Sequence, residues 1–123
     1  MNFSFRKMRI AGLTLSFVLL AACSANVDVA SVRGSFGDFN VVLLSTSTCG
    51  YCKKLRADLA DWGVDYVDID IESERKGRDA YEQLNGRGVP ILLIGDQVVH
   101  GYAPDRSREL LAAANLIPDS STP

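Results

Sequence analysis

The segment 41-VVLLSTSTCGYCKK-54 joins an apolar run to a Cys-x-x-Cys motif. The run Val41–Leu44 predicts a strand that is buried on both faces, because neither side of its pleat carries a polar residue. Three apolar residues follow at the spacing of one helix face: Leu55, Leu59 and Trp62. The sequence therefore predicts a strand, a short polar loop and a helix, with Cys49 and Cys52 where the helix begins.

The predicted position of the motif has a chemical consequence. At the first turn of a helix the backbone N–H groups have no partner within the helix, and the macrodipole favours negative charge. The sulfur of Cys49 is expected over the N–H groups of Tyr51 and Cys52, while Lys53 and Lys54 tune its pKa by adding positive charge. These effects favour the thiolate, which is the nucleophile in disulfide exchange. We therefore expect Cys49 to attack and Cys52 to resolve the mixed disulfide.

Two alternatives to redox chemistry are a structural disulfide and part of a zinc site. A zinc site needs four ligands. The chain has three cysteines and one histidine, His100, and the third cysteine, Cys23, lies far upstream of the motif. The ligand count therefore favours redox chemistry, and no metal is expected.

Charge and length narrow the range of partners. The chain has 123 residues, which suits one domain with extensions, and a formal net charge of −2. Removing Arg6, Lys7 and Arg9 with a predicted signal segment leaves 10 of the 13 basic residues against 15 acidic ones, a balance of −5. A mildly acidic product gives no reason to expect a nucleic acid as partner. We expect a monomer.

The N-terminal residues have the pattern of a bacterial lipoprotein signal. Three basic residues precede an apolar run, Ile10–Leu20, which is too short to span a bilayer as a mature helix but suits a signal peptide. The small residues before Cys23, in Leu20-Ala21-Ala22-Cys23, resemble a lipobox. That resemblance implies a signal peptide over residues 1–22, cleavage before Cys23 and lipidation of its thiol.

An ordinary secretory signal, cleaved near Ala22 or Ala25, keeps the same compartment and loses only the anchor. Lipidation of Cys23 also accounts for the odd number of cysteines, since it leaves one pair. By analogy with lipoprotein sorting, Ser24 after the cysteine favours the outer membrane. We therefore predict a protein of the cell envelope that faces the periplasm, with a lipidated N-terminus and flexible tether over 23–37.

The remaining patterns predict one domain over 38–117 and a disordered tail over 118–123. Strands are predicted over 39–44, 64–71, 90–94 and 97–100. Helices are predicted from the Cys-x-x-Cys motif to Gly63, from a Ser73 cap to about Asn85, and from Pro104 onward. A crossover helix makes the first two strands parallel, and the Gly95-Asp96 turn makes the last two a hairpin. This β-α-β-α-β-β-α order predicts an α/β, thioredoxin-like fold with a four-stranded mixed sheet and three helices.

Some residues have a purely structural interpretation. Gly77 is expected to weaken the second helix, in which Glu74 and Arg78 have the spacing of a favourable ion pair. The acids near the second strand, Asp65, Asp68 and Asp70, are interpreted as a solvated edge.

Three motifs resemble the glutaredoxin family: Thr48–Lys54, Gly88-Val89-Pro90 and Gly101-Tyr102. The resemblance covers about residues 38–116 and implies a glutaredoxin-like protein-disulfide oxidoreductase in which Cys49 attacks and Cys52 resolves. It also implies a cis Val89–Pro90 bond beside Cys49, with an extended substrate paired to the Val89 backbone. The substrate-binding residues that it implies are Tyr51, Val89, Pro90, Gly101 and Tyr102.

The chain departs from the family pattern where that family binds glutathione. Gly50 replaces the typical Pro, neither Thr46 nor Ser47 is basic, and Ala103 replaces the Asp that holds the glutathione amino group. The sequence Gly101–Asp105 looks more like glutaredoxin-like proteins that are reduced by thioredoxin reductase. No tightly bound cofactor is therefore expected, and the candidate electron donors are glutathione, as a co-substrate that binds weakly, and a thioredoxin-type reductant.

The leading hypothesis is a membrane-tethered, periplasmic thiol–disulfide oxidoreductase that acts on disulfide- or thiol-containing proteins. One rival is a Cu(I)-handling module that uses Cys49, Cys52 and His100, since soft thiolates suit that ion. Another is a monothiol enzyme that acts on glutathione mixed disulfides and needs only Cys49. The lack of Met or His clusters in the sequence disfavours the copper hypothesis.

Overall fold

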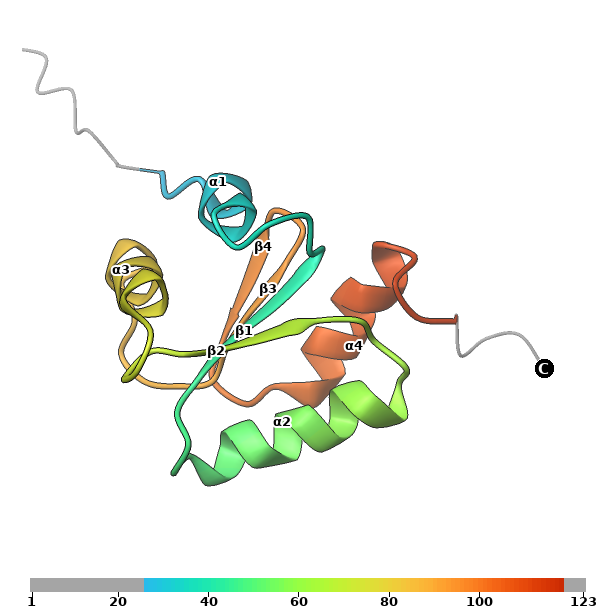
Figure 1. Cartoon of the computed structure of the whole chain (residues 1–123). Coiled ribbons are helices and arrows are strands. Elements are labelled where there is room, and N and C mark those ends of the chain that lie inside the picture. Colours follow the sequence, from blue (N-terminus) through green and yellow to red (C-terminus); the bar gives the residue numbers. More distant parts are fainter. Residues whose placement is uncertain (1–25, 119–123) are drawn as a thin grey trace, which may run out of the picture.

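A four-stranded sheet forms the centre of the computed structural model, which describes residues 26–118 (Figure 1). The strands are β1 (Val41–Ser45), β2 (Val67–Asp70), β3 (Ile91–Ile94) and β4 (Gln97–His100), in the order β2-β1-β3-β4. β1 runs parallel to β2, whereas β3 is antiparallel to both β1 and β4. The predicted parallel pair, the predicted hairpin and the α/β thioredoxin-like fold are therefore confirmed.

In the described part of the chain, four helices cover the two faces of the sheet, one more than predicted: α1 (Val29–Gly34), α2 (Gly50–Asp61), α3 (Arg75–Gln83) and α4 (Pro104–Ala113). Figure 1 shows α1 and α3 on one face and α2 and α4 on the other. Every residue of β1 and of β3 is buried, because both strands lie between two helical layers.

The core has two parts, one on each face of the sheet. On the α2 and α4 face, Leu55, Leu59 and Leu111 are fully buried against alternate residues of β1 and β3. On the other face, Val32 of α1 and Ala80 and Leu84 from α3 and its C-cap pack against the remaining residues of those strands. The predicted apolar stripe of α2 therefore faces the core, and Trp62, the C-cap of that helix, is partly buried against it.

The structure differs from the predicted flexible tether over residues 29–34, which form α1. Asp28 caps this helix, since its Oδ1 accepts a hydrogen bond from the Ser31 N–H at 3.1 Å. Val32 is buried against the sheet, and the Arg33 guanidinium donates to the carbonyl oxygens of Gly95, at 2.8 Å, and of Phe39. A short helix with one buried residue is stable here because of these tertiary contacts.

The region from β2 to α3 differs from the sequence-based prediction in detail. β2 is shorter than predicted, and Ser73 does not cap α3, whose N-cap is Glu74 without a side-chain bond. Glu74 and Arg78 form no ion pair, because Arg78 Nη2 donates instead to the Glu72 carbonyl at 2.9 Å. Gly77 is buried against the sheet, where a Cβ would meet Ile69 Cγ2 at 2.6 Å. The glycine therefore permits close packing of α3 on β2.

The predicted signal peptide, Cys23 and residues 119–123 lie outside the described residues. Among the helices of residues 26–118, none is long and apolar enough to cross a bilayer.

Candidate active site

The Cys-x-x-Cys motif lies where β1 leads into α2. Cys49 is the N-cap of α2, with extended backbone angles of φ −79° and ψ 112°. Its Sγ accepts a hydrogen bond from the Cys52 N–H at 3.1 Å, so the helix start directs one free backbone donor at the sulfur. Cys49 and Cys52 are joined by a disulfide. Cys52 is fully buried, whereas Cys49 is partly exposed, so a client can reach only the first sulfur.

A second loop meets the motif from the start of β3. The Val89–Pro90 peptide bond is cis, as the family resemblance implies, and the Val89 carbonyl oxygen lies 3.6 Å from Cys49 Sγ. Next to Val89 is an open cleft of about 580 Å³. Its lining comes from the segment before the cis bond and from the end of β4: Leu84, Asn85, Arg87, Gly88, Val89, His100 and Gly101.

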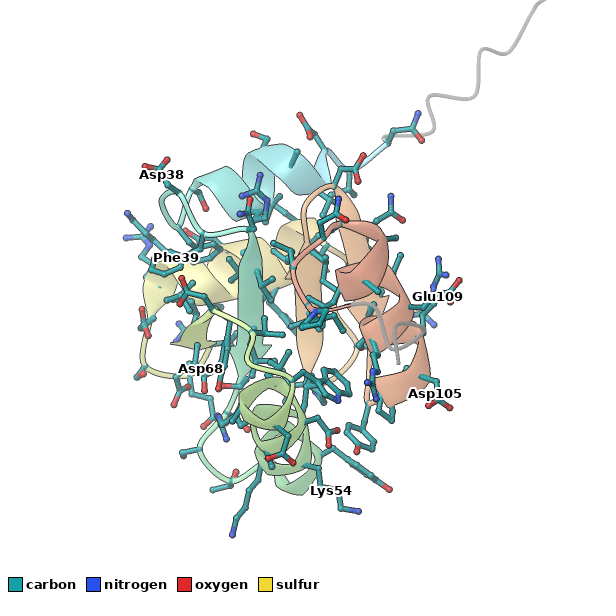
Figure 2. All side chains as sticks on the ribbon, turned by 90° about the vertical axis from the view of Figure 1, so that its right-hand side faces the viewer. Asp38, Phe39, Lys54, Asp68, Asp105 and Glu109 are labelled. Atoms are coloured by element: carbon teal, nitrogen blue, oxygen red, sulfur yellow. A yellow bond between two sulfur atoms is a disulfide. The ribbon has the colours of Figure 1, made fainter. Side chains whose placement is uncertain are left out.

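Two tyrosines and a lysine stack beside the motif. Tyr51 is 58% exposed, and its ring stacks on that of Tyr102 with 5.6 Å between the ring centroids and 27° between the planes. The Lys54 ammonium lies 5.2 Å from the centroid of the Tyr51 ring, a cation–π distance. Figure 2 shows the Lys54 side chain extending outward from α2. Lys53 is also exposed. Both lysines that were predicted to tune the pKa of Cys49 therefore lie on the solvent-exposed side of α2.

Asp58, one turn after Lys54 on α2, anchors the second tyrosine. The Tyr102 hydroxyl donates a hydrogen bond to Asp58 Oδ2 at 2.8 Å. This bond raises the pKa of Tyr102 above its ordinary value of 10.0, with smaller contributions from burial and from the charges of Asp58 and Asp105. The sequence-based reasoning missed Asp58. The spacing could have identified it, because a carboxylate seven residues after Tyr51 lies on the same helix face as that tyrosine.

The interpretation of Asp65, Asp68 and Asp70 as a solvated edge is confirmed, because β2 is an edge strand of the sheet, Asp65 and Asp68 are exposed and Asp70 is half-buried. The structure adds specific contacts to two of these residues. Asp68 forms an ion pair with Arg56 of α2 and accepts a hydrogen bond from the Ser45 hydroxyl. Arg56 Nη2 also donates to Ser45 Oγ at 2.8 Å. Asp70 Oδ1 accepts the N–H of Glu72 at 2.8 Å, which closes the turn after β2. The contacts among Ser45, Arg56 and Asp68 join α2 to β1 and β2. They thereby fix the position of the helix that carries the motif.

His100 lies exposed at the end of β4 and lines the cleft beside Val89. Across residues 26–118 no three side chains of His, Cys, Asp or Glu gather as a metal site requires. His100 is therefore not grouped with the two cysteines in the way that the copper hypothesis needs. Ala103, the expected departure in the glutathione site, is the N-cap of α4 and makes no side-chain cap bond.

Comparison with known proteins gives a consistent result. The family model of glutaredoxin matches residues 41–99, which run from the start of β1 almost to the end of β4. The chain is 30% identical, over 63 residues, to an uncharacterised glutaredoxin-like 8.6 kDa protein in the rubredoxin operon of Clostridium pasteurianum. That alignment covers 50% of this chain and 84% of the relative.

Solved structures show the same fold. The glutaredoxin of Archaeoglobus fulgidus superposes with a TM-score of 0.55 at 28% identity, covering 62% of this chain and 89% of the other. A buckwheat glutaredoxin–glutathione complex superposes with a TM-score of 0.59 at 20% identity, covering 74% of this chain and 93% of the other.

Proposed function

The chain belongs to the glutaredoxin family, and from this premise we propose that it is a membrane-tethered, periplasmic oxidoreductase of protein disulfides. A glutaredoxin-like redox protein exchanges thiols and disulfides through its Cys-x-x-Cys motif. The observation that carries the proposal is the asymmetry of the pair: Cys49 is reachable and lies at a helix N-terminus, whereas Cys52 is buried behind it. This arrangement suits one cysteine for attack and the other for release.

The proposed reaction passes two electrons from the protein to a client. The Cys49 thiolate attacks one sulfur of a client disulfide, and the other client sulfur leaves as a thiolate that takes up a proton. Cys52 then loses its proton and attacks Cys49 Sγ, which releases the first client sulfur as a thiolate. The protein ends with the Cys49–Cys52 disulfide and the client with two thiols. Every step is reversible, so the same residues oxidise a dithiol client when the protein starts as the disulfide.

The client chain is proposed to bind along the Val89 loop. The Val89 carbonyl already lies 3.6 Å from Cys49 Sγ, so a backbone paired with Val89 has its own cysteine next to the nucleophile. The adjoining cleft of about 580 Å³ is large enough to hold residues that flank that cysteine.

A direct test is exchange with an insulin-type disulfide substrate. The full-length protein, reduced first, should reduce the substrate with formation of one Cys49–Cys52 disulfide per client disulfide. Mass spectrometry of the Cys52→Ser variant should find a mixed disulfide on Cys49. Absence of both the exchange and the mixed disulfide would remove the oxidoreductase proposal.

Glutathione is proposed to be a weak co-substrate of this protein. Ala103 offers no carboxylate to a glutathione amino group, and a lost charged hydrogen bond typically costs about 1.5–3 kcal/mol. Ala103→Asp should therefore increase glutathione affinity about ten- to a hundredfold, with a smaller gain if solvent screens the contact.

Because Ala103 is the N-cap of α4, an acidic residue there also caps the helix. Ala103→Asn is the matched control, since it supplies the cap without the charge. Calorimetric titration with glutathione should detect the gain in Ala103→Asp alone. Equal affinity in the two variants would contradict the assignment of this position, as would ordinary glutathione turnover by the unsubstituted protein.

The membrane tether rests on the N-terminal sequence pattern that ends at Cys23. Only residues 24–27 separate Cys23 from Asp28, the N-cap of α1, so the two lie at most about 18 Å apart along an extended chain. Because α1 packs at the end of the sheet opposite to the Cys-x-x-Cys motif (Figure 1), a lipid on Cys23 would hold the motif facing away from the membrane. This orientation suits clients in the periplasmic space.

Fractionation of cells that express Cys23→Ser tests the tether. The variant should lose its membrane association, whereas a Cys49→Ser control should remain with the membranes after a carbonate wash. Unchanged, carbonate-resistant association of Cys23→Ser would contradict the lipid anchor and leave the redox proposal standing.

A further inference from the structure

We propose that Asp58 is a positioning residue for client selection, because it holds Tyr102, which in turn holds Tyr51 as a fixed wall beside Cys49. The inference rests on the proposed function, since it takes Tyr51 to be part of the client-binding surface.

The contacts form a continuous chain from the middle of α2 to the motif. Asp58 Oδ2 accepts the Tyr102 hydroxyl at 2.8 Å, and the Tyr102 ring stacks on Tyr51 at 5.6 Å. Lys54 adds its ammonium group 5.2 Å from the centroid of the Tyr51 ring. Tyr102 itself is partly buried against the core beneath α2 and α4, so it is a firm support.

This support matters because Tyr51 stands between the two cysteines and is 58% exposed. An exposed ring at a helix start can change rotamer. A client that packs on such a ring then binds more weakly, because the ring loses conformational entropy when it is ordered. A ring already held by stacking and by a cation needs little further ordering. Truncation of the distant Asp58 should therefore weaken client binding without touching the reacting sulfurs.

The Tyr51 ring and the surface beside it indicate which kind of client residue can bind there. Beside it lies an open hollow of about 320 Å³, largely apolar, formed by Gly50, Tyr51 and Lys54. An aromatic or long aliphatic side chain next to the client cysteine can pack on the Tyr51 ring and fill this hollow. The selected client is therefore a protein disulfide flanked by such a residue. Glutathione, whose cysteine is flanked by glycine and a γ-linked glutamate, has none to offer.

Two disulfide peptides that differ only in having Phe or Gly after the cysteine provide the test. The unsubstituted protein should prefer the Phe peptide. Asp58→Ala and Tyr102→Phe should each raise KM for the Phe peptide roughly three- to tenfold. Asp58→Ala should leave kcat and the kinetics of the Gly peptide unchanged. Because both substitutions break the same contact, the double variant should be no worse than either single one.

Two further variants separate positioning from a general structural role. Asp58→Asn keeps a carbonyl oxygen that can accept the Tyr102 hydroxyl, so it should restore most of the affinity for the Phe peptide. Asp61→Ala removes an exposed acid from the same helix and should behave like the unsubstituted protein. A melting temperature for each variant verifies that all of them fold.

The outcomes are distinct. Equal KM values for the two peptides in the unsubstituted protein would overturn this inference alone. A lower kcat in Asp58→Ala, or an equal rise in KM for both peptides in that variant, would also overturn it. No improvement of Asp58→Asn over Asp58→Ala would also overturn it. Absence of exchange with either peptide would overturn the proposed function, and this inference with it.

Discussion

Where β1 ends and β3 begins, the loops carry Cys49 and Val89, whereas at the opposite end of the same strands α1 packs on the sheet and Arg33 binds the two loops. We call the first the open end and the second, after the helix that packs there, the covered end. At the open end, Cys49 is partly exposed and is held by contacts with two backbone groups, the Cys52 N–H and the Val89 carbonyl. At the covered end, Arg33 binds two loop carbonyls and Val32 is buried. The sheet between them is the same, so the difference lies in α1, which packs at one end only.

The comparison indicates that the two ends of the sheet have different roles, one in exchange and the other in stability. The open end leaves a nucleophile, a cleft and an aromatic wall accessible to a client. The covered end adds buried apolar area and satisfies loop carbonyls, which supports the sheet on which the open end is built. Substitutions at the open end should therefore change exchange, and substitutions at the covered end should change stability.

The largest expected effect is at the open end. Cys49→Ser should abolish exchange, because the sulfur that forms the mixed disulfide is gone, whereas Cys52→Ser should still form a mixed disulfide but fail to release it. Stopped-flow reduction of a chromogenic disulfide distinguishes the two variants. Residual dithiol turnover in Cys49→Ser would show that Cys52 can act as the first nucleophile in spite of its burial.

The second expected effect is at the covered end. Val32→Asp should lower the free energy of unfolding by about 1.5–3 kcal/mol, the amount expected for burying one valine side chain. Exchange at 25 °C should remain unchanged, because α1 does not touch the motif. Urea denaturation measures the loss, and Ser31→Asp, which adds the same charge at an exposed position of α1, is the control. An equal loss in both variants would show that charge alone, and not burial, destabilises this helix.

A third experiment compares two helical glycines. Gly77→Ala should cost about 1–3 kcal/mol, because its Cβ would lie 2.6 Å from Ile69 Cγ2 and α3 must move away from β2. Gly34→Ala in α1 has no atom within 4 Å of the added Cβ, so it should be neutral or stabilising by up to about 1 kcal/mol. Thermal unfolding of the two variants provides the measurement. A stable Gly77→Ala protein would contradict the close packing of α3 on β2.

The smallest expected effect is a difference in pH dependence. The raised pKa of Tyr102 means that its contribution to stability is complete below pH 10 and is lost as the pH rises through the raised value. Titration of tyrosinate absorbance should show one high-pH component that moves to lower pH in Asp58→Ala and not in Asp61→Ala. An unchanged titration in Asp58→Ala would contradict the role of the hydrogen bond.

The sequence by itself predicted the elements whose causes are local. The apolar run before Cys49, the helical spacing of Leu55 and Leu59, and the turn at Gly95 depend on residues close in the chain. Pro104 begins the last helix as predicted, because its fixed φ suits the first helical position. The order of these elements, together with the motif at the first strand-to-helix junction, was enough to predict the fold.

Only the tertiary structure decided the features that depend on residues far apart in the chain. Helix α1 is too short to be stable alone, so its formation follows from contacts of Val32 and Arg33 with the sheet and the β3–β4 turn. Gly77 is favourable because of Ile69, and Asp68 is paired because α2 brings Arg56 to it. The Asp58–Tyr102 bond spans 44 positions. Such pairs leave no periodic signal in the sequence, because the physical reason for each residue lies in another element.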